Sequence, residues 1–371
     1  MDSKSTRLPA LDALRGLIVV LMALDHANHF VAQSHSSGEY WGGSFPAYTE
    51  ALAFLTRLVT HLAAPGFFFL MGVGMMLFAR SRRESGWSER AITRHFLIRG
   101  GILMLLQLAV VNRAWELSAG GWSLSIYVGV LFALGGAMIL GGLLLWLKPA
   151  YLLGLTAALV LGTELLTPNP GLWYQRFSLF QRLLLVPGGD IALWVNYPVL
   201  PWLELVTLGM VFGHWLVDDA RKAYERALWL GTAFIVVFLA LRCLDGFGNI
   251  RPRKGNTWID FLNPVKYPPS ITFTLLTMGV NLIILSLLVR LKGAWQGFCR
   301  PLVVLGRVPL FFYLSHLFLY AVLGRWLAPE GTSIPKMYLF WLLGLLILYP
   351  LCLCYGWLKQ RQPLDSILHY F

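Results

Sequence analysis

Residues 11–30 have the sequence LDALRGLIVVLMALDHANHF, an apolar run long enough to cross a bilayer as a helix. Ionisable or polar groups stand at both ends of the run: Asp12 and Arg15 at the first, and Asp25, His26 and His29 at the second. Ionisable side chains are costly inside a membrane span and therefore indicate a functional site. At about 1.5 Å of rise per residue, Arg15 and His26 would lie about 16 Å apart along the helix axis. This helix is thus predicted to carry one polar cluster near each face of the membrane.

The composition of the whole chain points to the same environment. Of its 371 residues, 57% are hydrophobic and 13% are charged, whereas a soluble domain carries about 25% charged residues. We therefore expect an all-α fold, a polytopic transmembrane helical bundle that forms a single domain over residues 1–371. Too little polar sequence is left over for a separate soluble domain.

Ten apolar segments are candidate spans. They are residues 10–30, 52–79, 96–116, 123–147, 151–166, 198–217, 227–244, 271–291, 302–323 and 336–358. The fourth contains Gly135, Gly136, Gly141 and Gly142, which favour close approach of a neighbouring helix.

The basic residues orient the spans. With the N-terminus inside, 19 of the 30 lysines and arginines fall on the cytoplasmic side and 11 on the other. This bias predicts that both termini are cytoplasmic. The formal net charge of +12 does not indicate nucleic acid, because the basic residues lie mainly in short loops between apolar runs. The four cysteines are scattered and predict neither a disulfide framework nor a metal site.

The sharpest candidate for chemistry is the pair Asp25 and His26 at the outer end of the first span. A carboxylate can orient an imidazole and stabilise its protonated form. Adjacent helical residues point about 100° apart, so Asp25 reaches His29, four positions on, more easily than His26. Alternatives are an interfacial pair solvated by headgroups, and a metal site built from Asp25, His26 and His29, for which no fourth ligand is evident.

The cytoplasmic end of the first span carries Asp12 and Arg15, three residues apart on one helix face. One interpretation is an ion pair that neutralises a buried charge. The other is that Arg15, together with Arg94 and Arg99 at the start of the third span, faces an anionic cofactor. The planar guanidinium suits phosphate because it donates two hydrogen bonds at once.

Further polar residues favour an acceptor site beyond the outer face. Arg57 and His61 lie four residues apart near the predicted depth of His26. The outer loop 245–270 contains four basic residues and Trp258, which suits an anionic or stacked sugar ring. We assign substrate binding to five residues: His29, Arg57, His61, Trp258 and Lys266. His316 lies near the middle of the ninth span, where a lone histidine is more often a packing residue; its role stays open.

Several segments resemble the heparan-alpha-glucosaminide N-acetyltransferase family of membrane acyltransferases, in its bacterial branch. The resemblance covers nearly the whole chain and is carried by the order of these motifs: LDALRGLIVVLMALDHANHF at 11–30, TRLVTHLAAPGFFFLMGVGMMLF at 56–78, RHFLIRGG at 94–101, NYPVLPWLELVTLGMVFG at 196–213, KYPPSITFTLLTMG at 266–279 and LGRVPLFFYLSHLFLY at 305–320. It implies transfer of an acetyl group from cytoplasmic acetyl-CoA to an amino sugar or glycan across the membrane. It also implies a reaction centre at Asp25 and His26, and a cofactor entrance at Asp12, Arg15, Arg94 and Arg99.

On this hypothesis the protein is an acetyl-CoA-dependent acyltransferase of the bacterial inner membrane, in contact with membrane lipids and not with nucleic acid. His26 acts either as general base or as nucleophile. The acceptor, the choice between N- and O-acetylation, and the assembly state are left open, with a homodimer as one alternative. The competing classes are a transporter of a small molecule or lipid-linked precursor, and a non-catalytic membrane assembly protein. A transporter of this kind typically has repeats with interrupted helices, and the two halves show no such repeat.

Overall fold

The computed structural model describes residues 8–35, 38–291 and 294–362. Helices form most of this part of the chain, and the only sheet in it is small. The all-α class expected from composition is therefore confirmed. The chain divides into two compact units, of which unit 1 comprises Met1–His35, Ala114–Gly121 and Ile283–Phe371, and unit 2 comprises Ser36–Arg113 and Trp122–Leu282.

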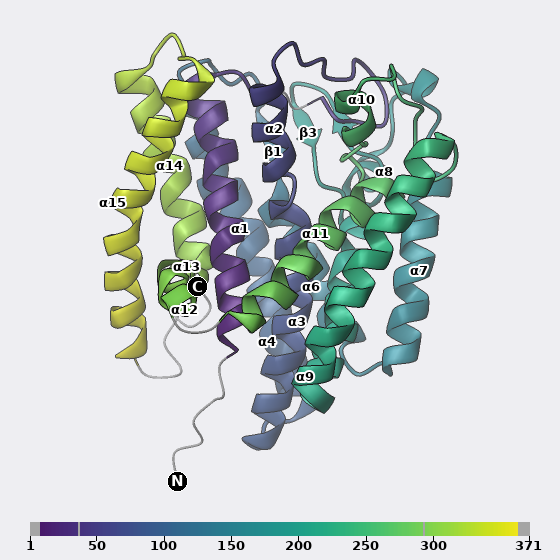
Figure 1. The fold of residues 1–371 in the computed structure, drawn as a ribbon, viewed down its shortest axis with the longest axis vertical. Coiled ribbons are helices and arrows are strands. Elements are labelled where there is room, and N and C mark those ends of the chain that lie inside the picture. Colours follow the sequence, from purple (N-terminus) through teal and green to yellow (C-terminus); the bar gives the residue numbers. More distant parts are fainter. Residues whose placement is uncertain (1–7, 36–37, 292–293, 363–371) are drawn as a thin grey trace. The chain divides into compact units, whose positions relative to one another are not determined.

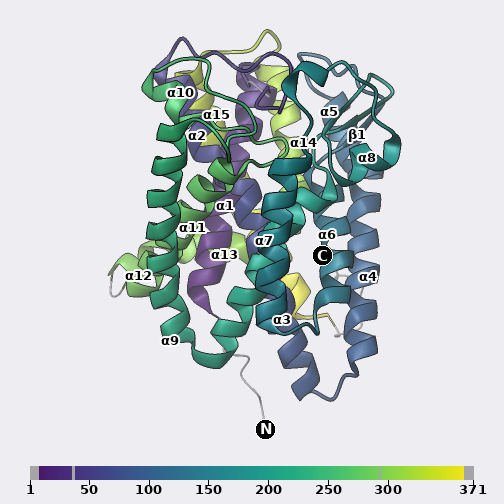
Figure 2. The same ribbon diagram turned by 90° about the vertical axis from the view of Figure 1, so that its right-hand side faces the viewer.

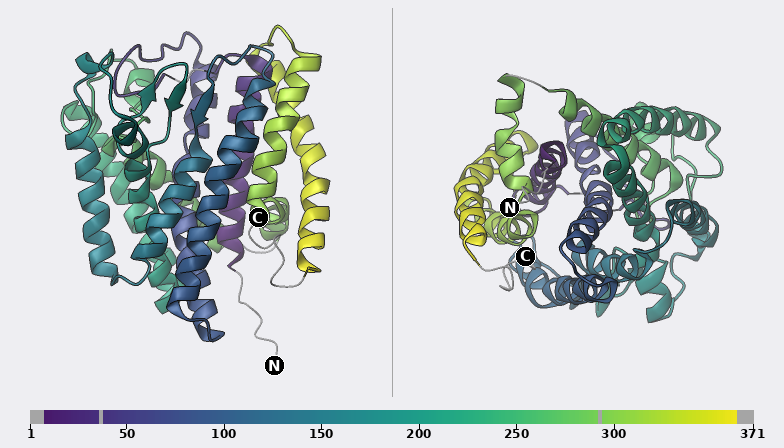
Figure 3. Two further views of the ribbon diagram at one scale, coloured as in Figure 1. Left: turned by 180° about the vertical axis from the view of Figure 1, so that it is seen from behind. Right: turned by 90° about the horizontal axis from the view of Figure 1, so that it is seen from below.

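Unit 1 is a group of helices packed around the first one. Its elements are α1 (Pro9–Ala27), the π-helical η1 (Asn28–Ala32), α12 (Ala294–Phe298), α13 (Arg300–Gly306), α14 (Pro309–Leu327) and α15 (Ile334–Gln360). Helix α1 packs against α13, α14 and α15, as Figure 1 and the view from below in Figure 3 show. The first helix of the sequence thus forms the centre of this unit.

Unit 2 contains the remaining helices. They are α2 (Ala51–Thr60), α3 (Ala63–Glu84), α4 (Glu89–Leu106), the π-helical η2 (Gln107–Val111), α5 (Asn112–Glu116), α6 (Val130–Leu144), α7 (Pro149–Leu166), η3 (Pro170–Leu172), α8 (Leu179–Leu184), α9 (Val199–Leu244), α10 (Trp258–Leu262) and α11 (Ile271–Arg290). The last turns of α5 and α11 already belong to unit 1. Helix α9 packs on α3, α6 and α7, and α4 packs on α6.

Helix α9 joins two of the predicted spans. It has 46 residues, and its backbone leaves the helical region at Asp219 (φ −158°, ψ 98°). Figure 2 shows the chain turning back at this lower end of unit 2. The predicted spans 198–217 and 227–244 therefore correspond to two helices that meet at a kink at Asp219.

A small sheet lies at the opposite end of unit 2, among the long loops. It consists of β1 (Ile126–Val128), β2 (Gly188–Gly189) and β3 (Leu193–Val195), in the order β1-β3-β2. Strand β1 pairs parallel with β3 in the register Tyr127 opposite Trp194, and β2 pairs antiparallel with β3. These pairs tie the loop that follows α7 to the segment that precedes α6.

Seven helices in the described residues are long and apolar enough to cross a membrane, which supports an integral membrane protein. They are Ala51–Glu84, Glu89–Glu116, Pro149–Leu166, Val199–Leu244, Ile271–Arg290, Pro309–Leu327 and Ile334–Gln360. Helix α6 is a shorter apolar helix, and α1 carries Asp12, Arg15 and Asp25 within its 19 residues. Each predicted span thus has a helix, while the number of spans and the side of the termini stay predictions.

Close helix packing in unit 2 occurs where the glycines predicted it. A Cβ atom built on Gly100 of α4 would lie 2.6 Å from the carbonyl oxygen of Gly135 in α6, and one built on Gly135 would lie 2.5 Å from the oxygen of Gly100. Neither carbonyl oxygen could make room for such a Cβ atom unless its whole helix shifted. The two glycines therefore set the distance between α4 and α6.

Replacing Gly100 with alanine is expected to destabilise the protein by about 1–3 kcal/mol, the usual cost of overpacking a well-filled interior. The matched control is the next residue, Gly101, whose added Cβ would meet nothing within 4 Å. Gly101→Ala is expected to be neutral or to stabilise slightly, because alanine favours a helix over glycine by up to about 1 kcal/mol. Thermal unfolding in detergent compares the two, and equal midpoints would contradict the proposed contact.

Candidate active site

The C-terminal end of α1 is shaped by a change of helix type. Helix α1 passes into the π-helix η1 at Asn28, and the chain leaves it at Gln33 with a left-handed backbone (φ 54°, ψ 25°). Single π-helical turns occur frequently at functional sites because they re-aim the side chains around them. Three of the residues predicted to be functional, Asp25, His26 and His29, lie at this transition.

Two histidines from distant parts of the sequence meet here in unit 1. The Nδ1 atom of His26 lies 2.7 Å from Nε2 of His316, which belongs to α14. The ring of His316 is fully buried, whereas His26 is half-buried. The lone intramembrane histidine that the sequence left without a role is therefore the hydrogen-bond partner of His26.

The hydrogen bonds around His316 define a tautomer for each neutral ring. The other nitrogen of His316, Nδ1, lies 3.0 Å from the carbonyl oxygen of Phe312. A carbonyl only accepts, so Nδ1 of His316 carries the hydrogen and its Nε2 must accept. Nδ1 of His26 is then the donor in the 2.7 Å contact. This assignment leaves the lone pair of His26 on Nε2, the atom that a base or nucleophile would use.

Asp25 makes a different contact from the one expected. Its Oδ1 lies 3.2 Å from Nε2 of His35, and the rings of His35 and His29 lie 5.8 Å apart. Neither contact joins Asp25 to His26, in line with the angle of about 100° between neighbouring helical side chains. Asp25 is therefore placed to support the charge of the histidine cluster from an adjacent position.

Trp115 forms an aromatic wall for this cluster within unit 1. Its ring lies 5.5 Å from that of His26 and 4.6 Å from that of His29, in both cases edge to face. Phe30 stacks on the same indole at 5.1 Å. An aromatic wall limits the positions that the His26 ring can take and lowers the local polarity around it.

At the other end of α1, the predicted cofactor residues Asp12 and Arg15 form an ion pair. Arg15 Nη1 donates to Asp12 Oδ1 at 2.9 Å and to the Gly306 carbonyl oxygen at 3.1 Å. Asp12 Oδ2 lies 3.6 Å from Nε of Arg307. Two guanidinium groups thus share one carboxylate, and Nε and Nη2 of Arg15 make no hydrogen bond within the described residues. Asp12 and Arg15 thus form the ion pair of the first interpretation. With Arg307 included, the three side chains also carry the net positive charge that the second interpretation requires for binding phosphate.

The other two predicted cofactor residues lie on α4 in unit 2. Arg94 is exposed, whereas Arg99 is half-buried. They are five residues apart, and at 3.6 residues per turn the two side chains leave the helix in different directions. Arg99 is therefore better placed than Arg94 to hold a ligand against the protein.

Two of the predicted acceptor residues gather around a carboxylate that the sequence did not single out. Arg57 on α2 donates from Nε to Glu39 Oε1 at 2.7 Å and from Nη2 to Glu39 Oε2 at 2.8 Å, and His61 Nε2 lies 3.6 Å from Oε1. Glu39, Arg57 and His61 are each at most 1% exposed. Burial alone would raise the pKa of the Glu39 carboxyl, but Arg57, His61 and Lys266 together lower it to about 2.

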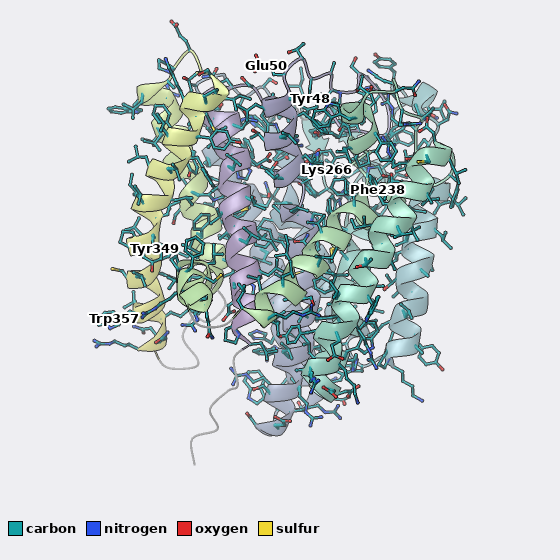
Figure 4. The ribbon with its side chains drawn as sticks, in the orientation of Figure 1. Tyr48, Glu50, Phe238, Lys266, Tyr349 and Trp357 are labelled. Atoms are coloured by element: carbon teal, nitrogen blue, oxygen red, sulfur yellow. The ribbon has the colours of Figure 1, made fainter. Side chains whose placement is uncertain are left out.

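Lys266 joins this cluster through the backbone and by its charge. Its N–H donates to the Glu39 carbonyl oxygen at 2.9 Å, and its Nζ lies 5.0 Å from the ring centre of Tyr267. Figure 4 labels Lys266 with Tyr48, whose hydroxyl donates to Glu39 Oε1 at 3.4 Å. Lysine, arginine and glutamate leave a net positive charge in a buried region, which suits an anionic group of a substrate.

Other basic residues, in the loop 245–270, have structural partners. Arg251 donates to the carbonyl oxygens of Tyr40 and Gly43 at 3.3 and 3.2 Å, and Lys254 Nζ donates to that of Phe45 at 3.1 Å. Trp258 packs its half-exposed ring 5.4 Å from Phe54. These contacts hold the loop 245–270 against the loop 38–50. The basic side chains Arg251 and Lys254 therefore bind backbone carbonyl groups of the protein itself.

Within residues 8–35, 38–291 and 294–362, no group of three or more His, Cys, Asp or Glu side chains is arranged to hold a metal ion.

Comparison with known families identifies the class of protein. Residues 7–242 match the family model described as "Heparan-alpha-glucosaminide N-acetyltransferase, catalytic". The chain belongs to this family. The match covers well over half of the sequence, including α1 with His26 and all of α2, α3, α4 and α9 up to Arg242. No curated protein matches the chain. Membership of the family supports a membrane acetyltransferase-type function and disfavours the transporter and assembly-protein alternatives.

The sequence did not indicate the contacts of three residues in these clusters: His35, Glu39 and His316. Glu39 and His35 lie in a loop rich in glycine and serine, and no periodic pattern marks such a loop as part of the interior. His316 was noticed, but its partner is 290 residues away. One available signal was that Glu39 is followed directly by Tyr40 and Trp41, because two large aromatic residues in a polar loop favour burial.

Glu39→Gln is expected to destabilise the protein by about 3–5 kcal/mol, because it leaves the buried Arg57 guanidinium without its counter-charge. The pKa of Glu39 in the folded state, about 2, is lower than its ordinary value of 4.5. The ionised Glu39 therefore makes its full contribution to the free energy of unfolding above about pH 4.5. This contribution is lost as the pH falls from there towards 2.

Thermal unfolding measured against pH tests both statements. The wild-type midpoint should fall over this acid range, and the fall should be smaller in Glu39→Gln. Glu50→Gln is the control, since Glu50 is an exposed carboxylate of the same loop. If Glu50→Gln and Glu39→Gln shifted the midpoint equally, the ion pair would not be a structural anchor.

Proposed function

We propose that this protein transfers an acetyl group from cytoplasmic acetyl-CoA to an amino sugar or glycan hydroxyl on the opposite side of the membrane. Its family membership supports the class of reaction. The observation that carries the finer proposal is the contact between His26 and His316 at 2.7 Å. It supplies a half-buried imidazole whose reactive nitrogen is defined by a fixed hydrogen-bond chain.

In a direct route, His26 Nε2 accepts the proton of the acceptor's amine or hydroxyl while that atom attacks the acetyl carbonyl. The carbon–sulfur bond of the thioester breaks, and coenzyme A leaves as a thiolate that takes up a proton. The imidazolium formed at His26 keeps its Nδ1–H on His316 Nε2, which spreads the positive charge. General base catalysis of this kind contributes about 10²–10⁴-fold.

In a two-step route, His26 Nε2 attacks the acetyl carbonyl itself and forms a carbon–nitrogen bond as the carbon–sulfur bond breaks. The nitrogen or oxygen of the acceptor then attacks the acetyl group, the carbon–nitrogen bond to His26 breaks, and the proton that the acceptor loses neutralises the coenzyme A thiolate released in the first step. Both routes require the same lone pair on Nε2, so the tautomer set by Phe312 serves either. Asp25, whose Oδ1 lies 3.2 Å from His35 Nε2, is proposed to supply a negative charge one residue away from the imidazole that becomes cationic.

The acetyl donor is proposed to bind through arginines at the cytoplasmic end of the early helices. The candidate for its phosphates in unit 1 is Arg15, which Asp12 holds in place. The candidate in unit 2 is Arg99, with Arg94 as an exposed neighbour on the same helix. The acceptor is proposed to contact His29, Arg57, His61, Lys266 and Trp258. The membrane is proposed to be the bacterial inner membrane, with both termini in the cytoplasm.

His26→Ala is expected to lower the rate of acetyl transfer by at least about 10²-fold, the lower bound for loss of a general base. His316→Ala is expected to lower it by about 10- to 100-fold, because it removes a hydrogen bond to a group that becomes charged. Asp25→Asn should lower the rate of acetyl transfer less than His26→Ala does. Initial rates with acetyl-CoA and a glucosamine acceptor measure these losses.

His316 acts through His26, so its test needs a second readout. His316→Gln, which retains an acceptor oxygen, should recover part of the activity lost in His316→Ala, and the acid limb of the pH–rate profile should move between these variants. His214→Ala, in α9 of unit 2, is the control. If His316→Ala abolished transfer while His26→Ala kept it, the reacting nitrogen would belong to His316. A labelled acetyl group found on His26 by mass spectrometry would favour the two-step route.

Arg99→Ala is expected to weaken acetyl-CoA binding by roughly tenfold to a hundredfold, because it removes a charge-assisted hydrogen bond to phosphate. Arg90→Ala is the matched control, since Arg90 is an exposed arginine of the same helix. Calorimetric titration of the purified protein with acetyl-CoA measures both. Equal affinities for the two variants would move the donor site away from Arg99.

A further inference from the structure

A cleft in unit 2 lies where three helices approach their ends. It has a volume of about 500 Å³ and is lined by the last turns of α3, by residues 145–147 after α6, and by the part of α9 just before its kink. These helices pack on one another within unit 2. Figure 2 shows the lower ends of α3 and α9 on the side of unit 2 away from the small sheet. The volume is in the range of small-molecule sites.

The cleft lies at a boundary between lipid and water. The segments Ala51–Glu84 and Val199–Leu244, which line two of its sides, are both long and apolar enough to cross a membrane. Trp146 lines the cleft, and tryptophan is enriched at membrane interfaces. Its Nε1 donates to Thr93 Oγ1 at 3.1 Å, and its ring centre lies 5.4 Å from the guanidinium carbon of Arg83. An occupant of the cleft can therefore have one part in the lipid and another in water.

The cleft has an apolar floor and a charged rim. Buried apolar side chains form the floor: Met76, Ala79 and Leu145. Exposed charged side chains form the rim: Arg80, Arg83, Glu84 and Asp218. The two positive and two negative charges of the rim cancel, so the cleft favours neither a simple anion nor a simple cation.

Both arginines of the rim keep unused donors. Arg80 Nε donates to Glu84 Oε1 at 2.5 Å, and Arg83 Nη2 lies 3.0 Å from Glu89 Oε1. The two Nη groups of Arg80, and Nε and Nη1 of Arg83, make no hydrogen bond within the described residues. Exposed ion pairs of this kind are weak. The two guanidinium groups, three residues apart on one helix, are therefore available to a phosphate.

The carboxylate of Asp218 is available to a cation. It makes no hydrogen bond and no ion pair within the described part of the chain. The neighbouring carboxylate differs, because Asp219 Oδ1 accepts from the N–H of Lys222 at 3.1 Å and its Oδ2 lies 3.3 Å from Lys222 Nζ. One acidic side chain at the kink of α9 thus has a structural partner, and the other faces the cleft without one.

We propose that this cleft binds a phospholipid with a phosphatidylethanolamine headgroup. Its phosphodiester accepts from Arg80 and Arg83, its ammonium donates to Asp218, and its acyl chains leave along the apolar floor into the bilayer. Pockets between membrane helices that are purely basic bind anionic headgroups. Here a purely anionic headgroup would face Asp218 without a compensating cation, whereas a headgroup with both charges matches both signs of the rim.

The inference goes beyond the proposed function, because the lipid is neither the donor nor the acceptor of an acetyl group. Its binding can be measured without acetyl transfer. A cleft that fails to bind the lipid would therefore leave the proposed reaction untouched, and an inactive protein that binds the lipid would leave this inference untouched.

The test is native mass spectrometry of the delipidated full-length protein in detergent, titrated with phosphatidylethanolamine, phosphatidylglycerol and phosphatidylcholine of identical acyl chains. Phosphatidylethanolamine is expected to form a saturable one-lipid adduct and to bind about two- to fivefold more tightly than either other lipid, the effect of one exposed charge pair. Phosphatidylglycerol has no cation for Asp218, and the choline of phosphatidylcholine has no N–H group to donate.

Asp218→Asn should remove the preference for phosphatidylethanolamine without weakening the binding of phosphatidylglycerol. Arg83→Ala should weaken the binding of both by about two- to fivefold, because both carry the phosphodiester. The matched control for Asp218→Asn is Glu225→Gln, since Glu225 is an exposed carboxylate of α9 outside the cleft; it should bind as the wild type does.

Equal affinities of the wild type for the three lipids would overturn the proposal and leave only an unspecific lipid contact. A preference for phosphatidylethanolamine that survives in Asp218→Asn would also overturn it, as would tighter binding of phosphatidylglycerol. Displacement of bound phosphatidylethanolamine by acetyl-CoA would assign the cleft to the acetyl donor instead.

Discussion

The interior of a bilayer offers no water to hydrogen-bond, and this constraint governs the structure. Backbone groups satisfy themselves by forming helices, and each buried polar side chain must find a partner in another part of the protein. His26 and His316 meet this requirement across 290 residues of sequence, and Glu39 and Arg57 meet it with two short hydrogen bonds at complete burial. The positions of the ionisable groups are therefore tied to the packing of the helices that carry them.

The same constraint gives the histidine pair its chemical character. A carbonyl oxygen on the preceding turn of α14, that of Phe312, accepts from one nitrogen of His316 and so fixes which nitrogen accepts from His26. Two imidazolium cations cannot share such a short contact, since like charges at this distance repel strongly. The contact therefore favours a pair in which one ring donates and the other accepts.

Charged residues in the two units serve two distinct ends. Some pairs neutralise charge and hold elements together, as Asp12 and Arg15 do in unit 1 and Arg251 does by fastening one loop of unit 2 to another. Some of these side chains also keep donors that have no hydrogen-bond partner among the described residues, as Arg15 does at Nε and Nη2 and Arg83 does at Nε and Nη1. A ligand would bind through these remaining donors, because the other donors already have hydrogen-bond partners within the protein.

The sequence by itself determined the helical membrane class, the position of nearly every helix and the family. These follow from long apolar runs and from local motifs such as residues 11–30. It also singled out His26 as a candidate, because an ionisable residue stands out against an apolar helix. It could not supply the partners. The contact of Asp25 with His35, the contact of His316 with His26, the burial of Glu39 and the cleft at the ends of α3 and α6 all depend on segments that meet only in the folded chain. Hydrophobic periodicity sets the type and face of an element, but the contacts between side chains of distant elements arise from packing, and only the tertiary structure decided them.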